Sequence, residues 1–193
     1  PDKNLLELAI DEAKPTALRT LALANVKKNY PLLTTDTLAV LAKSDSRSIK
    51  REAVHALAIH PDAKRANLLA KIANDHSVDA TLRADAIAGL AAGGQYHVAL
   101  LKILASNSDP GSAEEANRTL VAAGLVQRKV ETKPPAERVE DWVALVEREA
   151  SGQPDVAAGR RLFFHSTFAG CYKCHAMQGR GSAVGPDLTI IHK

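Results

Sequence analysis

Two cysteines and a histidine near the C-terminal end of the chain have a spacing that suits covalent chemistry. They occur as Cys171-Tyr172-Lys173-Cys174-His175, a C-x-x-C-H sequence typical of c-type haem attachment. Two thiols three positions apart on a turn can each add to one vinyl group on the same porphyrin edge, and the histidine then lies under the iron. The motif predicts one covalent haem c, held by Cys171 and Cys174, with His175 as the proximal iron ligand.

Other uses of the cysteines stay open at the level of sequence. A thioredoxin-like redox pair follows a strand in a βαβ unit, and the sequence shows no such context here. A structural zinc site needs four ligands. Cys171, Cys174, His175 and His165 could supply sulfur and nitrogen atoms, but a second ligand pair at a clear separation is lacking. A plain disulfide is a further interpretation.

The sequence around the motif resembles the haem-binding half of a class I cytochrome c. That family has an N-terminal helix, a C-x-x-C-H loop, glycine-rich turns and a Gly-Pro-x-Leu segment. The matching positions are the stretch Asp155 to Phe164, with Gly159 four residues before Phe163, then Gly179 and Gly181, and then Gly185-Pro186-Asp187-Leu188. The resemblance implies that the Pro186 carbonyl accepts a hydrogen bond from the His175 ring and orients it. It makes Cys171, Cys174, His175 and Pro186 the cofactor-binding residues.

In that family the distal iron ligand, usually a methionine, and the helix that closes the haem crevice follow well after the Gly-Pro-x-Leu segment. Residues 153–193, the C-terminal module, therefore correspond to the N-terminal part of such a domain. We expect no distal ligand within them. Met177 lies on the same turn as His175 and would have to reverse direction to reach the other haem face. His165 and His192 have suitable chemistry but no supporting pattern.

A different kind of sequence precedes the C-terminal module. Up to residue 126 the chain is a series of Ala/Leu-rich amphipathic stretches in which an Ala-x-x-x-Leu pair recurs every 30 to 36 residues. The copies are Ala17/Leu21, Ala53/Leu57, Ala86/Leu90 and Ala116/Leu120. Each repeat predicts two helices, the second carrying the Ala/Leu pair, and such units bury their apolar faces by stacking. Residues 1–126 resemble HEAT-type repeats, which implies an all-α fold with a right-handed α-solenoid of about four helix pairs.

Residues 127–152 form a predicted linker and docking helix. The linker contains the pair Pro134-Pro135, and a helix is expected from Ala136 to Ala150. The apolar stripe of this helix consists of Val139, Trp142, Val143 and Val146. We expect it to dock on a neighbouring domain, with Trp142 as a packing residue.

Several polar residues have a structural and a functional interpretation. Ser112-x-x-Glu115 is a capping box that predicts a helix start. His55, like the other histidines of the repeats, is expected on the repeat surface. The basic residues around the motif could steer an acidic redox partner or form a solvated cationic face; they are Arg160, Arg161, Lys173 and Arg180.

Composition excludes several classes of function. The 193 residues carry 25 basic and 22 acidic side chains, a net charge of +3, with no block of like charge, so we expect no nucleic-acid partner. The apolar runs are shorter than the roughly 18 residues that cross a bilayer, so we expect no transmembrane segment. No paired carboxylates, nucleophile and base, or phosphate loop stand out, which favours an electron carrier over an enzyme.

The order of helical repeats, linker and cytochrome-like module resembles the C-terminal part of large secreted haem proteins, the planctomycete and verrucomicrobial membrane-bound dehydrogenases. Because the chain opens at Pro1, we expect it to be an excerpt or a processed product. The resemblance implies a periplasmic or otherwise exported electron-transfer module, partnered by a redox protein or by the catalytic domain of its parent. The alternative is a helical-repeat interaction scaffold whose C-x-x-C-H segment binds zinc or no metal.

Overall fold

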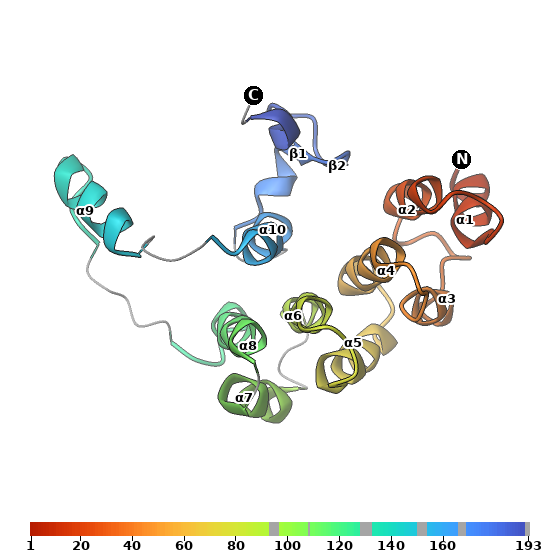
Figure 1. Cartoon of the computed structure of the whole chain (residues 1–193), viewed down its shortest axis with the longest axis horizontal. Helices are drawn as coiled ribbons and strands as arrows, with labels where there is room; N and C mark the ends of the chain where they lie inside the picture. The colour runs from red at the N-terminus through yellow and green to blue at the C-terminus, as the bar shows by residue number, and fades with distance from the viewer. Residues whose placement is uncertain (93–96, 108, 128–132, 150–153, 166–168, 192–193) are drawn as a thin grey trace.

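The computed structural model describes the chain except for residues 93–96, 108, 128–132, 150–153, 166–168 and 192–193. Its described part contains ten α-helices and one two-stranded antiparallel sheet (Figure 1). The fold is therefore all-α, as the abundance of alanine and leucine predicts.

The first eight helices form four consecutive pairs. They are α1 (Asp2–Ile10) with α2 (Thr16–Asn25), α3 (Thr35–Leu41) with α4 (Arg47–Ile59), α5 (Lys64–Asn74) with α6 (Ala80–Gly89), and α7 (Val98–Asn107) with α8 (Pro110–Ala122). The second helix of each pair also packs on the second helix of the next pair, so that α2, α4, α6 and α8 form a row of inner helices. This row lines the concave side of the arc in Figure 1.

The Ala/Leu pairs explain why the inner helices pack so closely. Ala53, Leu57, Ala86 and Ala116 are fully buried and belong to one continuous hydrophobic core that runs through all four helix pairs. Alanine lets the helix backbones approach, and leucine fills the space between them. In α4, α6 and α8 the repeat spacing therefore marks the contact side of the helix, whereas Ala17 and Leu21 lie on an exposed side of α2.

The start of α8 differs from the sequence prediction. The helix begins at Pro110, and the Asp109 carboxylate caps it by accepting a hydrogen bond from the Ser112 backbone N–H at 3.0 Å. Proline fits the first helical position because its φ angle is preset and its missing N–H is not needed there. The capping box at Ser112 was thus a wrong prediction, and Glu115 is a buried residue with another partner.

The C-terminal module begins with α10 (Val156–Phe164), which is capped by Asp155. A 3₁₀ turn η2 (Cys171–Lys173), a short hairpin of β1 (Ala176–Met177) and β2 (Arg180–Gly181), and a second 3₁₀ turn η3 (Leu188–Ile190) follow. The module lies on the concave side of the arc, with α10 against α6 (Figure 1). The inner helices and the C-terminal module thus face each other.

Helix α9 (Val139–Glu149) stands apart from the other helices (Figure 1). Val139, Val143 and Val146 are each at least half exposed, and the Trp142 indole N–H donates to the Pro135 carbonyl at 3.0 Å. The indole finds its partner in the adjacent linker, and the apolar stripe of the helix is largely exposed in the described part of the chain. The docking of this helix on a neighbouring domain stays a prediction.

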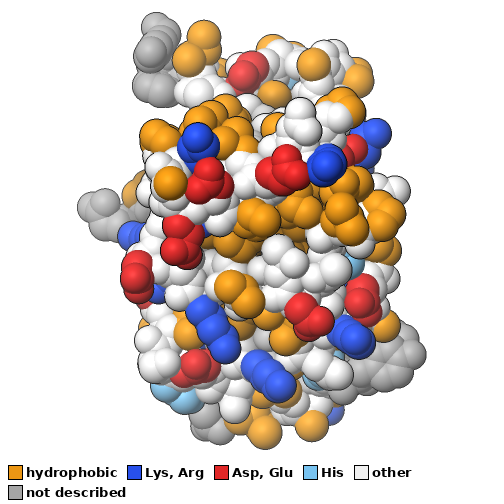
Figure 2. Space-filling view, turned by 90° about the vertical axis from the view of Figure 1, so that its right-hand side faces the viewer, with side chains coloured by type: hydrophobic (Ala, Val, Ile, Leu, Met, Phe, Trp, Pro, Cys, Tyr) orange, Lys and Arg blue, Asp and Glu red, His pale blue; other side chains and the backbone are white. Residues whose placement is uncertain are grey.

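The surface at the N-terminal end of the arc carries acidic and basic side chains in alternation (Figure 2). Hydrophobic side chains gather between them across the upper middle of this view. None of the described helices is both long and apolar enough to cross a membrane.

Truncation of a core leucine should measure how much the stack depends on its inner helices. Leu57 is fully buried, so Leu57→Ala should lower the free energy of unfolding by about 2–5 kcal/mol, because it removes apolar contacts and leaves a cavity. Equilibrium denaturation followed by circular dichroism checks this. The control is Val40→Ala, at a position 71% exposed. Equal losses for both variants would contradict the packing described here.

Candidate functional site

The two cysteines lie on a single turn at the surface of the C-terminal module. Gly170 starts the turn with a positive φ of 64°, a conformation that glycine adopts without strain. The backbone N–H groups of Cys174 and His175 then donate to the Cys171 carbonyl at 3.2 and 2.9 Å. Both cysteines are free and exposed. The turn therefore presents two exposed thiols that are not joined in a disulfide.

The His175 ring is fixed by the Gly185-Pro186 segment. Its Nδ1 atom lies 3.0 Å from the Pro186 carbonyl oxygen. Since a carbonyl oxygen only accepts, Nδ1 carries the proton, and Nε2 is the nitrogen with a lone pair for a metal. This contact is the one that the resemblance implies. The binding of haem by Cys171, Cys174, His175 and Pro186 stays a prediction.

Gly185 makes this contact sterically feasible. A Cβ atom at position 185 would lie 2.7 Å from Cε1 of the His175 ring, closer than real Cβ contacts. The Gly185 N–H also donates to the Cys174 carbonyl at 2.6 Å. Glycine is therefore needed because the backbone passes directly against the ring that it orients.

The β1–β2 hairpin folds back over the same turn. Gln178 and Gly179 form its tip, both with positive φ, as expected for a tight hairpin turn. A Cβ atom at Gly181 would collide with the His175 carbonyl oxygen, and the Ser182 N–H donates to the Tyr172 carbonyl at 2.9 Å. The family-like glycines at 179 and 181 thus shape the loop around His175.

Arg161 of α10 inserts into the concave face of the inner helices. Its Nε donates to Glu115 Oε2 of α8 at 2.8 Å, and its Nη1 lies 3.6 Å from Asp85 Oδ1 of α6. The Arg161 side chain is only 4% exposed, and both carboxylates are buried to a similar degree. The guanidinium therefore joins the C-terminal module to two different repeats.

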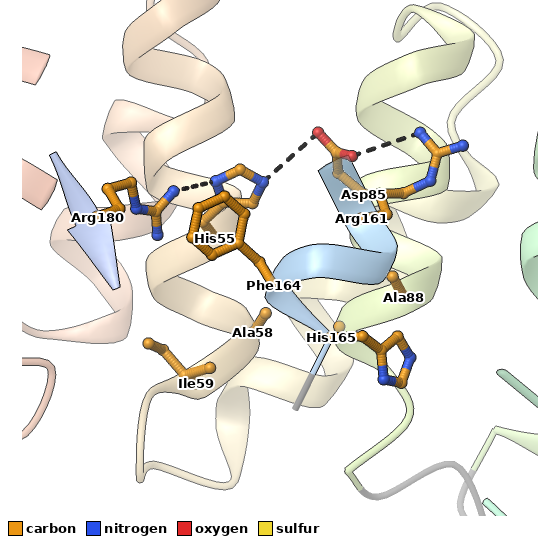
Figure 3. Close-up of a pocket in the computed structure, with 10 residues that line it drawn as sticks. His55, Ala58, Ile59, Asp85, Ala88, Arg161, Phe164, His165 and Arg180 are labelled. Atoms are coloured by element: carbon orange, nitrogen blue, oxygen red, sulfur yellow. Dashed lines mark hydrogen bonds and ion pairs between the residues drawn. The ribbon is translucent and has the colours of Figure 1, made fainter. Parts of the chain in front are cut away.

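Arg180 of the hairpin makes the second connection, to α4. Its Nη1 donates to His55 Nδ1 at 2.6 Å and lies 3.0 Å from Glu52 Oε2. Because Nδ1 of His55 accepts, the ring proton is on Nε2, which faces Asp85 Oδ2 at 3.8 Å (Figure 3). The expected surface role of His55 is thus wrong. The ring lies between the repeats and the module.

The Phe164 ring packs against arginine and histidine side chains in the same interface. The guanidinium groups of Arg160 and Arg180 lie over its ring, with their central carbons 5.1 and 4.9 Å from the ring centroid. The His55 ring lies 6.4 Å from it. Cation–π contacts of this kind gain strength when water is excluded. Arg160, Arg161 and Arg180 therefore face the chain itself, and the prediction of a solvated cationic face fails for them.

The acidic partners of these arginines follow the repeat. Glu52, Asp85 and Glu115, here named the acidic row, each stand directly before the alanine of an Ala-x-x-x-Leu pair. Their spacing places one carboxylate on each of three successive inner helices, on the side that faces the module. Sequence reasoning missed this row, although the shared position before the alanine was a usable signal.

Burial and charge shift the titration of the interface groups. Burial lowers the pKa of His55, and the nearby Arg180 charge adds to this against the pull of Glu52 and Asp85. Burial raises the pKa of the Glu52 carboxyl, but His55 and Arg180 more than offset this, so its pKa lies below the usual value. For Glu115, burial dominates and raises the pKa. His55 is therefore held neutral, which keeps its Nδ1 available to Arg180.

His165 does not join the cysteine turn. It is buried and lines a hollow of about 80 Å³ with residues of α4 and α6, among them Ala58 and Ala88, on the α6 side of α10 (Figure 3). Burial lowers its pKa, and Arg118 adds to this. Met177 lies in β1, paired with Arg180, and His192 lies outside the described residues.

A four-ligand zinc site is not assembled in the part of the chain that the structure describes. No three His, Cys, Asp or Glu side chains within it come together as potential ligands of a metal ion. The set of Cys171, Cys174, His175 and His165 considered from the sequence is thus not brought together.

Comparison with models of known families, with curated proteins and with solved structures finds no match to this chain.

Removal of the Arg161 charge should release the C-terminal module. Arg161→Met keeps most of the side-chain volume but leaves Asp85 and Glu115 without their shared partner. We expect the free energy of unfolding to fall by about 3 kcal/mol, the lower end of the range for removing one partner of a buried ion pair. The loss is not larger because Arg118 still contacts Glu115. Amide hydrogen exchange should also quicken in α10. Lys173→Met, at an exposed cation of the same module, is the control, and unchanged exchange in α10 of the Arg161 variant would refute the role of this contact.

Acidification should weaken the interface through His55. An unfolded histidine takes up a proton near pH 6.5, whereas native His55 has a lowered pKa and stays neutral, so stability falls as the pH drops below about 6.5. His55→Gln keeps an acceptor for Arg180 but cannot titrate. Between about pH 7.5 and 5.5 it should lose less stability than the wild type, by up to about 1.4 kcal/mol per pH unit.

The comparison of the two proteins is needed because Glu115, with its raised pKa, has the opposite effect on the slope. Its contribution is the same in both and cancels. Denaturant unfolding at several pH values gives the two slopes, and identical slopes would contradict the neutral state of His55.

Proposed function

We propose that this chain is a c-type haem-binding electron-transfer module carried on a HEAT-like α-solenoid. The observation that carries the proposal is the His175 ring beside two exposed thiols, with its Nδ1 bound to the Pro186 carbonyl at 3.0 Å. A carbonyl oxygen that accepts from one ring nitrogen fixes the tautomer and the direction of a metal-binding imidazole. A surface histidine without a ligand has no need of such an orientation.

The residues of the C-terminal module fit a porphyrin. Cys171 and Cys174 are exposed and not joined in a disulfide, so both thiols are available for thioether formation, and Nε2 of His175 is left for the iron. Val184 and Ile191, 82% and 76% exposed, provide apolar surface on the same module, which a porphyrin face would cover. Haem bound there would supply a one-electron ferric/ferrous couple.

The repeats give the module a fixed position. Arg161 and Arg180 connect it to α4, α6 and α8, so the cysteine turn is held on the concave side of the arc rather than on a free tether. Electron transfer requires close approach of the haem edge to its partner, and a fixed mount restricts the directions of approach. The partner on this proposal is a redox protein or the catalytic domain of a larger, dehydrogenase-like parent.

Covalent haem also implies a location. In bacteria, c-type maturation takes place outside the cytoplasmic membrane, so the proposal includes a periplasmic or otherwise exported site of action. The right-handed solenoid and the cytochrome-like character of the module belong to the same proposal, supported by the stacked helix pairs and by the C-x-x-C-H and Gly-Pro-x-Leu segments.

Loss of both thiols should separate haem attachment from the repeat fold. Cys171→Ala combined with Cys174→Ala should abolish haem-dependent peroxidase staining on a denaturing gel, for protein made in cells with a c-type maturation system. The far-ultraviolet circular dichroism of residues 1–126 should persist, because the cysteines contribute nothing to the repeat core.

Lys173→Ala is the matched control for this variant, since it alters the same turn but keeps both thiols, and it should stain like the wild type. Staining that survives in the double variant would contradict covalent attachment. A wild-type chain that never stains would favour the interaction scaffold, with zinc or no metal at the motif. Loss of the helical signal would contradict the two-part organisation.

A further inference from the structure

An open groove lies between α2 and α4 on one side and α10 with the β1–β2 hairpin on the other. Its volume is about 620 Å³, within the range of small-molecule sites. Arg51, Arg160 and Arg180 line it, together with the hydroxyl groups of Thr16, Thr20 and Ser48. Both halves of the chain therefore contribute cations and donors to one cavity.

Positive charge in the groove exceeds the negative charge. Glu52 is the carboxylate in the groove wall. Asp85, which does not line the groove, has its Oδ2 atom 3.4 Å from Nε of Arg51. Burial lowers the pKa of Arg160, and the charges of Arg180 and Arg51 add to this more than Glu52 and Asp85 oppose it. An anion in the groove would relieve this repulsion.

The donors in the groove are not all used. The buried Nε of Arg160 has no hydrogen-bond partner among the described residues, while its Nη1 donates to Gln178 Oε1 at 2.8 Å. Arg180 uses the same Nη1 atom for its contacts with His55 and Glu52. On the opposite wall, the Thr20 hydroxyl donates to the Thr16 carbonyl at 2.8 Å and lies 3.0 Å from the Ser48 hydroxyl. A buried donor without an acceptor is unfavourable, so the Nε of Arg160 favours an anion beside it.

We propose that this groove binds a small dianion, held by the guanidinium groups of Arg51, Arg160 and Arg180 and by the Ser48 hydroxyl. Guanidinium groups match the planar oxygen pairs of carboxylates and the oxygens of phosphates. These two kinds of dianion share the chemistry that the groove recognises. The inference does not rest on haem, because none of these residues belongs to the cysteine turn.

The position of the groove gives binding a structural consequence. Arg51 and Ser48 belong to the repeats, whereas Arg160 and Arg180 belong to the C-terminal module. An anion that contacts both sides stabilises the docked arrangement over any separated one, by the linkage between binding and folding. Ligand binding should therefore slow hydrogen exchange in α10.

The test uses the full chain and two probes, inorganic phosphate and succinate, each titrated calorimetrically against a sodium chloride blank of equal ionic strength. Ala17 lines the groove from the exposed side of α2. Ala17→Glu places a fixed carboxylate in the groove and leaves every arginine intact. It should weaken probe binding by about tenfold or more, the equivalent of one lost charge-assisted contact. Ala17→Gln, of the same size but neutral, is the matched control and should bind at most slightly more weakly than the wild type.

A second pair of variants tests the cations directly. Arg160→Gln should weaken binding to a similar degree, whereas Arg47→Gln, the same substitution at an exposed arginine of α4 outside the groove, should bind like the wild type. Binding of phosphate alone, succinate alone or both supports the site and names its ligand class. No binding by the wild type beyond the chloride blank, or equal binding by the Ala17→Glu and Ala17→Gln variants, would overturn the proposal.

Discussion

The arrangement of the two halves of this molecule depends on one buried guanidinium. Arg161 is 4% exposed and contacts Glu115 and Asp85 on two neighbouring inner helices. Removing three charged groups from water is costly, and such a cluster persists only where the charges are closely paired. Because the partners come from successive repeats, the cluster is complete only in one register of α10 along the arc. Its value lies in specifying this position more than in adding stability.

The cysteine turn benefits from the same constraint. Its own core is small, since glycines at 181 and 185 bring backbone directly against His175 and little apolar surface is buried there. Phe164 and Arg180 connect the turn and hairpin to α4. A short segment made of turns gains a defined orientation by resting on a rigid helical stack, much as loops elsewhere present functional groups from a scaffold.

The helix pairs and the cysteine turn could be predicted because their signals are local. The Ala-x-x-x-Leu spacing marks the buried side of α4, α6 and α8, and the contact between His175 and Pro186 joins residues only eleven positions apart. The acidic row could not be recognised in the same way, because Glu115 fits a capping box and Glu52 fits a solvated helix face. Their burial depends on α10 packing above them, a contact between residues 46 apart for Arg161 and Glu115. The apolar stripe of α9 has a related limit as a signal, since periodicity shows that a face is apolar but not what covers it.

The most direct test of the account is the visible spectrum of the full chain, produced in cells that carry a c-type maturation system. Reduced-minus-oxidised difference spectra with a pyridine haemochrome assay should show sharp α and β bands, and the colour should stay with the protein through acid-acetone extraction. That result is predicted by two thiols on one turn beside a histidine oriented by Pro186. A colourless protein, or one whose haem is removed by the extraction, would contradict it.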